Sequence, residues 1–240
     1  MTRAMFRDRA DAGRRLAGKL LPLKGEEPVV LALPRGGVAV GLEVALALDA
    51  PLDLLLVRKI GAPGHPEFAL GAVVDGVSPE IVLDEEVVAA LGVPETYLRD
   101  TARRELEEIE RRRGLYLRGR RPVDVRGRTA VVVDDGIATG STVRVALLAL
   151  DHSGAARRVL AAPVAPPDTA GRLRALGDEA VFLATPADFR AAGAYYDDFR
   201  QLEDGEVVAM LGRAIREPGR SGPDETDRRG RGPLRSEGRT

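Results

Sequence analysis

Short runs of consecutive apolar residues, each followed by a stretch with helical spacing, are the feature that most restricts how this chain can fold. The runs lie at residues 29–33, 52–57, 129–133, 159–164 and 180–183. Continuous apolar runs of this length are typical of strands that are buried on both faces. Helical patterns follow several of them, at 38–48, 142–150 and 168–176. Strands alternating with helices predict a three-layer α/β/α fold with a mainly parallel twisted sheet.

The remaining segments fall into smaller elements and a tail. We expect an amphipathic helix over 6–21, a Gly- and Pro-rich loop over 58–68, short strands near 70–74 and 81–83, and a long charged helix over 94–118. From residue 217 to 240 the only large apolar residue is Leu234. The sequence therefore predicts one domain over 1–216 and a disordered polar tail over 217–240.

Composition narrows the possible partners. The 240 residues carry a formal net charge of -1, which favours neither a nucleic-acid nor a membrane partner. The chain has no cysteine, so disulfides and cysteine-ligated metals are excluded. We find no apolar stretch long enough to span a membrane and no signal-peptide pattern at the start. We expect a soluble cytoplasmic protein that binds small molecules or other copies of itself.

The run from Val131 to Thr142 is the strongest candidate binding site. Three valines form a buried strand, and Asp134 and Asp135 stand at its C-terminal end, where open α/β sheets bind ligands. Gly136 and Gly140 permit a tight turn before the next helix. Successive amides there could bind a phosphate, aided by the helix dipole and by nearby hydroxyl groups. Because carboxylates repel phosphate, the acid pair is better suited to the two hydroxyls of a ribose.

The complete run resembles the ribose-phosphate signature of the type I phosphoribosyltransferases: apolar strand, two acids, two variable residues, then Ala-Thr-Gly-Ser/Thr-Thr. Strand termination and helix capping are the simpler explanation for such residues. The resemblance implies that the donor is 5-phosphoribosyl 1-diphosphate and that the product is pyrophosphate. It assigns the ribose hydroxyls to Asp134 and Asp135. The 5′-phosphate is assigned to Ala138, Thr139, Gly140, Ser141 and Thr142.

A second loop, Pro34-Arg35-Gly36-Gly37, follows the first buried strand and opens a helix. The resemblance assigns the donor pyrophosphate to Arg35, Gly36 and Gly37, and it implies a cis bond at Pro34-Arg35 or Arg35-Gly36. It also implies the strand order 3-2-1-4-5-6, in which strands 1 and 4 are neighbours. Loops 34–37 and 136–142 would then face one crevice at the topological switch point.

The expected loop 58–68 resembles the mobile lid of these transferases, although a surface loop with ordinary charges is the alternative. Arg58 and Lys59 could neutralise the departing pyrophosphate, and Glu67 is a candidate general acid or base. Mg²⁺ is expected to be held mainly by the donor diphosphate, with Asp134 and Asp135 as further candidate ligands. No covalent nucleophile is required, because the reaction is catalysed by holding the reactants in line.

The acceptor base is not assigned by the sequence. Ala138 stands where the hypoxanthine-guanine branch has a catalytic aspartate, which counts against that branch's mechanism. Stacking on a base is one role for the aromatic residues Phe189, Tyr195, Tyr196 and Phe199 of a small hood, and packing on the core is the other. The segments Leu-Pro-Arg-Gly-Gly, Arg-Lys-x-Gly-Ala-Pro and Gly-Ala-Tyr-Tyr resemble bacterial phosphoribosyltransferase-like proteins that have no settled acceptor.

Two other functions are compatible with the pattern. One is a regulator that senses the donor or a nucleotide without turnover. The other is a phospho-acceptor protein, in which Asp134 or Asp135 would take a phosphoryl group, but it gives no role to residues 138–142. A transferase of nucleotide metabolism, acting in nucleotide salvage, fits more of the residues. Transferases of this kind are commonly dimers, so a homodimer is a further expectation.

Overall fold

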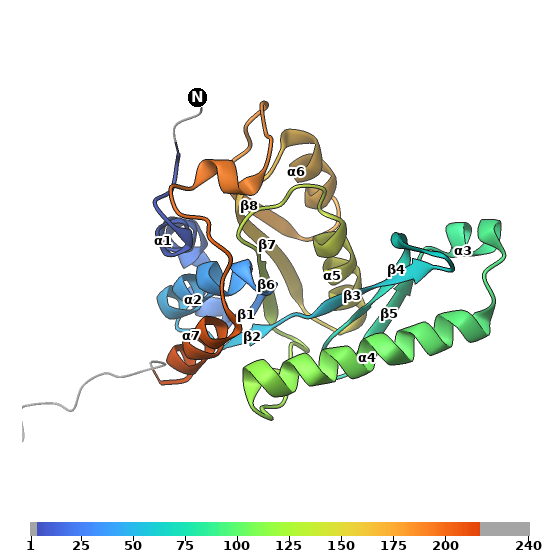
Figure 1. Ribbon diagram of the computed structural model, residues 1–240. Helices are drawn as coiled ribbons and strands as arrows, with labels where there is room; N and C mark the ends of the chain where they lie inside the picture. Colours follow the sequence, from blue (N-terminus) through green and yellow to red (C-terminus); the bar gives the residue numbers. More distant parts are fainter. Residues whose placement is uncertain (1–3, 217–240) are drawn as a thin grey trace, which may run out of the picture.

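The computed structural model describes residues 4–216, and the predicted tail lies outside the described residues. Its centre is a sheet of five parallel strands in the order β2-β1-β6-β7-β8 (Figure 1). These strands are β1 (Val29–Ala32), β2 (Leu52–Leu54), β6 (Thr129–Val133), β7 (Arg157–Val164) and β8 (Glu179–Ala184). Each begins where an apolar run was predicted, or within a few residues of it.

Helices cover both faces of this sheet (Figure 1). One face packs against α1 (Arg9–Leu20), α2 (Gly36–Leu48) and α7 (Asp204–Arg216), and the other against α5 (Ser141–His152) and α6 (Pro167–Arg174). Successive strand residues alternate between the two cores: Val131 faces α2, whereas Val132 faces α5. Both are fully buried, which explains the continuous apolar runs. The predicted three-layer α/β/α fold is confirmed.

The strand order 3-2-1-4-5-6 is wrong, because the described sheet has five strands and the segment after β2 leaves it. Only Leu55 and Leu56 separate β2 from the next strand. A parallel neighbour needs a crossover of a dozen or more residues, so this short link cannot return the chain to the same sheet. The neighbours at the switch point are nevertheless as predicted, since β1 pairs directly with β6.

A second, antiparallel sheet follows, with strands β3 (Val57–Ala62), β4 (His65–Val74) and β5 (Glu80–Leu83). The prediction of a loop over 58–68 is therefore wrong, because β3 and β4 form a hairpin that turns at Pro63 and Gly64. Gly61 is part of the strand for a steric reason: a Cβ there would lie 2.4 Å from the carbonyl oxygen of Pro66. Such close cross-strand approach, with the register shifting beside it, favours glycine.

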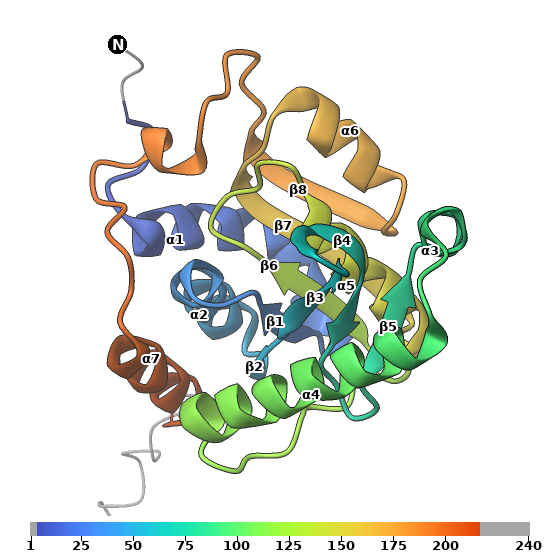
Figure 2. The same cartoon turned by 45° about the vertical axis from the view of Figure 1, so that its right-hand side comes forward.

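The charged helix α4 (Glu95–Leu117) follows α3 (Glu85–Leu91) and runs past the small sheet to the side of α7 (Figure 2). It was expected to be mostly solvated, yet its inner face buries six side chains: Leu98, Thr101, Ala102, Ile109, Tyr116 and Leu117. Short 3-10 helices occupy Leu21–Glu26 and Ala192–Tyr195. None of the helices within residues 4–216 combines the length and apolar character needed to cross a bilayer.

Candidate functional site

The acid pair lies at the C-terminal end of β6, at the edge where β1 and β6 adjoin. Asp134 is half-buried, and its Oδ1 accepts a hydrogen bond from the backbone N–H of Asp135 over 2.8 Å. Burial raises the pKa of the Asp134 carboxyl well above the usual range for aspartate, and the charge of Asp135 raises that pKa further. Both effects favour the protonated form of Asp134.

Asp135 has a cationic partner that sequence reasoning missed. Nε of Arg9, at the start of α1, donates to Oδ2 of Asp135 over 2.6 Å, and the two side chains are only 10% and 14% exposed. The same guanidinium lies 3.9 Å from the ring centroid of Phe199 and donates to the carbonyl of Arg200. The two partners are 126 positions apart, so no local pattern could have indicated this ion pair.

The predicted phosphate loop joins β6 to α5. Gly140 has a φ of 77° and stands directly before the first residue of α5. Ala138, Thr139, Ser141 and Thr142 are exposed, which leaves their hydroxyls and amides accessible. The carbonyl of Ala138 accepts a hydrogen bond from Thr169 Oγ1 over 3.0 Å, which ties the loop to α6. The arrangement is that of an anion site at a helix N-terminus.

The glycine loop touches the acid pair. A Cβ on Gly36 would lie 1.9 Å from Oδ2 of Asp135, and a Cβ on Gly37 would lie 2.7 Å from the carbonyl oxygen of Val133. The peptide bond Pro34-Arg35 is cis, one of the two positions expected. Loops 34–37 and 136–142 therefore meet at one edge of the sheet. Only glycine allows this approach, which explains the Gly-Gly pair.

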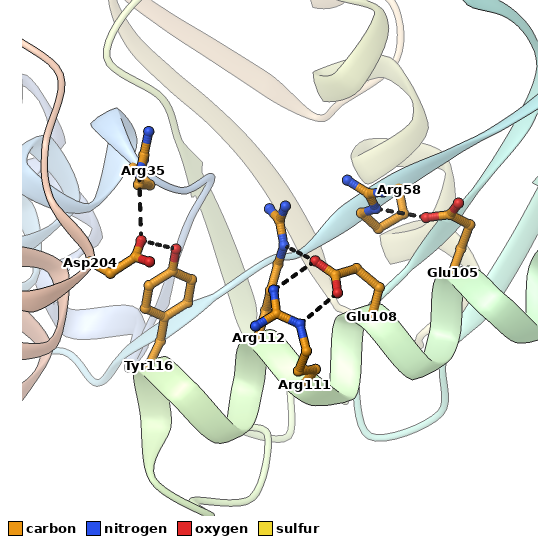
Figure 3. Close-up of polar contacts among 8 residues, drawn as sticks. All are labelled: Arg35, Arg58, Glu105, Glu108, Arg111, Arg112, Tyr116 and Asp204. Carbon is orange, nitrogen blue, oxygen red and sulfur yellow. Dashed lines mark hydrogen bonds and ion pairs between the residues drawn. The ribbon is translucent and has the colours of Figure 1, made fainter. Parts of the chain in front are cut away.

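Arg35 is turned toward two other elements (Figure 3). Its Nη1 lies 3.5 Å from Oδ1 of Asp204, at the start of α7, and that oxygen accepts a hydrogen bond of 2.7 Å from the hydroxyl of Tyr116, in the last turn of α4. This hydrogen bond, together with the charge of Arg35, lowers the pKa of Asp204. The candidate pyrophosphate loop is thus held by residues of α4 and α7.

The hairpin places Arg58 and Lys59 on a cleft that Ser141 and Thr142 also line. Nε of Arg58 donates to Oε2 of Glu105 over 2.7 Å, so its guanidinium is held on α4 (Figure 3). Glu67 lies in β4, but its side chain is outside the described part of the structure.

The hood aromatics belong to one apolar cluster, in which the tyrosines are buried and the phenylalanines are half-buried. Tyr195 and Tyr196 are only 2% and 6% exposed, and they pack with Phe6 in a small apolar cluster. This burial favours packing over base stacking for both tyrosines. The hydroxyl of Tyr196 donates to the backbone carbonyl of Asp135 over 2.6 Å, so Tyr196 helps to hold the backbone of the acid pair in place. Phe189, half-buried and stacked on Tyr195 at 5.7 Å between ring centroids, stays a candidate for contact with a base.

Within residues 4–216, no group of three or more His, Asp or Glu side chains is arranged to hold a metal ion. The oxygens of the acid pair are partly engaged by Arg9 and by a backbone amide. The candidate site thus brings two glycine-containing loops together around a pair of carboxylates. This arrangement is suited to a sugar that carries phosphate groups at two positions.

Comparisons with known proteins agree on one domain type. The profile of the phosphoribosyl transferase domain matches residues 5–181. Two proteins of Mycobacterium tuberculosis, from strains CDC 1551 and H37Rv, are 48% identical over 214 residues, 89% of this chain, and both are provisionally named phosphoribosyl transferases. The chain spans 48% of the length of these relatives. The crystal structure of TT1426 from Thermus thermophilus has a TM-score of 0.76 and 47% identity, covering 86% of this chain and 97% of that one.

Proposed function

Because this chain belongs to the phosphoribosyl transferase domain family, we propose that it transfers the 5-phosphoribosyl group of 5-phosphoribosyl 1-diphosphate to a nitrogen of an acceptor base. The observation that carries the proposal is the contact between two loops: the glycine pair of loop 34–37 lies against the acid pair that precedes the phosphate loop. A donor with phosphate at both ends of a ribose needs this geometry. With a free base as acceptor, the reaction is one of nucleotide salvage.

Each part of the donor has a proposed partner. Asp134 and Asp135 accept hydrogen bonds from the ribose 2′ and 3′ hydroxyls. The amides and hydroxyls of residues 138–142 bind the 5′-phosphate at the positive end of α5. Arg35 and the amides of Gly36 and Gly37 bind the diphosphate. Arg9 is a positioning residue, because it contacts Asp135 rather than the donor.

In the proposed reaction the acceptor nitrogen forms a bond to C1 of the ribose as the bond from C1 to the diphosphate oxygen breaks. In the transition state the bond to the acceptor nitrogen is partly formed, the bond to the diphosphate oxygen is partly broken, and positive charge develops on the sugar ring. The protein contributes by aligning the reactants and by neutralising the departing pyrophosphate, for which Arg58 and Lys59 are the proposed residues. A proton must leave the acceptor nitrogen, and Glu67 is the proposed base.

Mg²⁺ is proposed to enter with the donor. The carboxylates of Asp134 and Asp135 are the protein oxygens proposed for it, and two of these four oxygens already accept a hydrogen bond, one from Arg9 and one from a backbone amide. These residues therefore fit a metal that is bound chiefly by the donor diphosphate. When bound, the ion neutralises charge on the diphosphate as it departs.

The double variant Asp134→Asn/Asp135→Asn tests the donor site. We expect calorimetry to show that donor binding is abolished, because the side-chain amides accept hydrogen bonds from the ribose hydroxyls more weakly than carboxylates do. Circular dichroism should show an unchanged fold, because asparagine and aspartate have nearly the same size and shape. Asp100→Asn, an exposed residue of α4 paired with Arg103, is the control and should bind normally. Unchanged donor affinity in the double variant would refute the assignment. Release of pyrophosphate with a panel of nucleobases then separates a transferase from a sensor, which binds the donor without releasing pyrophosphate.

A further inference from the structure

A cleft of about 640 Å³ lies between the hairpin, β5, α4 and α5. Its apolar walls include Leu70, Val145 and Leu148, and Tyr97 stands among them with its hydroxyl donating to the carbonyl of Gly61 over 3.0 Å. Ser141 and Thr142 of the phosphate loop also line it, so the cleft adjoins one end of the proposed donor site. A cleft of this size suits a small heterocycle.

The cleft carries an excess of positive charge. The charged side chains that line it are Arg58, Lys59, Arg104, Arg144, Glu105 and Asp84. Arg58 and Glu105 neutralise each other at 2.7 Å (Figure 3). None of the ion pairs between described side chains involves Lys59, Arg104 or Arg144, so three cations face the cleft with one acid left to oppose them. The space is therefore suited to an anion.

Arg104 and Arg144 have no role in the donor site proposed above. Both lie on helices of the framework, α4 and α5, whereas Lys59 lies on the hairpin. Arg144 stands one turn from the start of α5, where the helix dipole disfavours a cation and where an anion would offset the unfavourable placement. Arg104 donates only to Thr101 Oγ1 over 2.9 Å and keeps further N–H groups for a ligand.

We infer, on the basis of the proposed function, that the acceptor carries a carboxylate, and that Arg104 and Arg144 bind it in this cleft. The donor's own anionic groups are assigned to loops 34–37 and 138–142, which leaves these arginines for the second substrate. Their guanidinium groups match the oxygens of a carboxylate or phosphate. The acidic group would lie between α4 and α5, and the acceptor nitrogen would face C1 of the bound donor.

Matched pairs of bases test the inference: orotate against uracil, and nicotinate against nicotinamide. Each is titrated calorimetrically into the full chain, with and without the Mg²⁺-loaded donor, and pyrophosphate release is followed for the same set. The variants are Arg104→Gln/Arg144→Gln and the control Arg103→Gln, whose side chain is paired with Asp100 and does not line the cleft. We expect at least one acid to bind wild type more than about tenfold tighter than its neutral partner, as charge-assisted hydrogen bonds provide. The ratio of acid to neutral-base affinity should fall below about twofold in the double variant and stay unchanged in Arg103→Gln.

The outcomes separate the two proposals. Absence of any acid preference in the wild type, or its persistence in the double variant, would overturn the assignment of the cleft. The assignment would also be overturned if the double variant lost as much affinity for the donor as for the acid, because the arginines would then bind the donor. Failure of the wild type to bind the donor would instead refute the proposed function. An acid preference seen without donor would then identify the cleft as an anion site of another kind.

Discussion

At the scale of single residues, the two neighbouring carboxylates are held in different environments. Arg9 pairs with Asp135 at 2.6 Å, whereas burial and the charge of Asp135 raise the pKa of Asp134. An acid in the environment of Asp134 takes a proton at a higher pH than an ordinary aspartate. Donor binding should therefore depend on the protonation of Asp134.

The first prediction concerns pH. A ribose hydroxyl donates to a carboxylate, so donor affinity should fall as the pH drops through the raised pKa of Asp134 and the carboxyl gains a proton. The loss should begin well above about pH 4, the range of an ordinary aspartate. Calorimetric titration of the donor between about pH 5 and about pH 8 measures it. The donor phosphates also titrate near about pH 6, so Asp134→Asn is the reference. Parallel profiles for wild type and variant would contradict the prediction.

The second prediction concerns Gly36. In Gly36→Ala the new methyl group would lie 1.9 Å from Asp135 Oδ2, so either the acid or the loop must move. We expect donor affinity to fall by more than about tenfold, the effect of losing one charge-assisted hydrogen bond. Gly18→Ala, exposed within α1 with no atom near its Cβ position, is the matched control. It should bind normally and gain about 0.5–1 kcal/mol of stability. Equal affinity of the two variants would refute the close-contact argument.

At the scale of elements, the hairpin is held against α4 by the ion pair between Arg58 and Glu105. In Glu105→Gln this attraction is lost, and a partly exposed pair contributes up to about 1 kcal/mol. The amides of β3 and β4 should then exchange with deuterium up to about fivefold faster, which mass spectrometry of peptides from the hairpin can measure. Glu107→Gln, exposed on the same helix, should leave the exchange unchanged. Equal rates in both variants would show that the pair does not hold the hairpin.

The buried strands and the positions of the glycine-containing loops after β1 and β6 were predictable from sequence because each depends on local patterns. The valines of β6 make both faces of that strand apolar, and the residues around Gly140 are consecutive in the sequence. The hairpin was not predictable, because Gly61, Pro63, Gly64 and Pro66 are typical of a loop when taken singly. Their strand conformation depends on pairing across the turn. The pairing of Arg9 with Asp135 likewise arises only in the folded chain, where α1 packs against α2, β7 and β8.

At the scale of the whole molecule, a buried group of three charges joins the two sheets. The guanidinium of Arg113, in α4, donates to Asp75 at the end of β4 and to both carboxylate oxygens of Asp53 in β2. The two aspartate side chains are 3% exposed and that of Arg113 is 11% exposed. Asp53 also accepts from the backbone N–H of Val123 over 2.7 Å. The position of the hairpin relative to the parallel sheet thus depends on one arginine.

The last prediction is that Arg113→Met destabilises the fold by about 3–5 kcal/mol, because it leaves two buried carboxylates without a cation. Burial already raises the pKa of Asp75 in the folded state. Such a group contributes fully to stability below its unfolded-state pKa, and this contribution is lost as the pH rises through its folded-state pKa. Removing the cation raises this pKa further, so the deficit should be larger at about pH 8 than at about pH 5. Urea unfolding at both values measures it. Arg103→Met, exposed on the same helix, should change stability by less than about 0.5 kcal/mol. A deficit that does not change with pH would show that lost packing, and not the unpaired charge of the aspartates, is the cause.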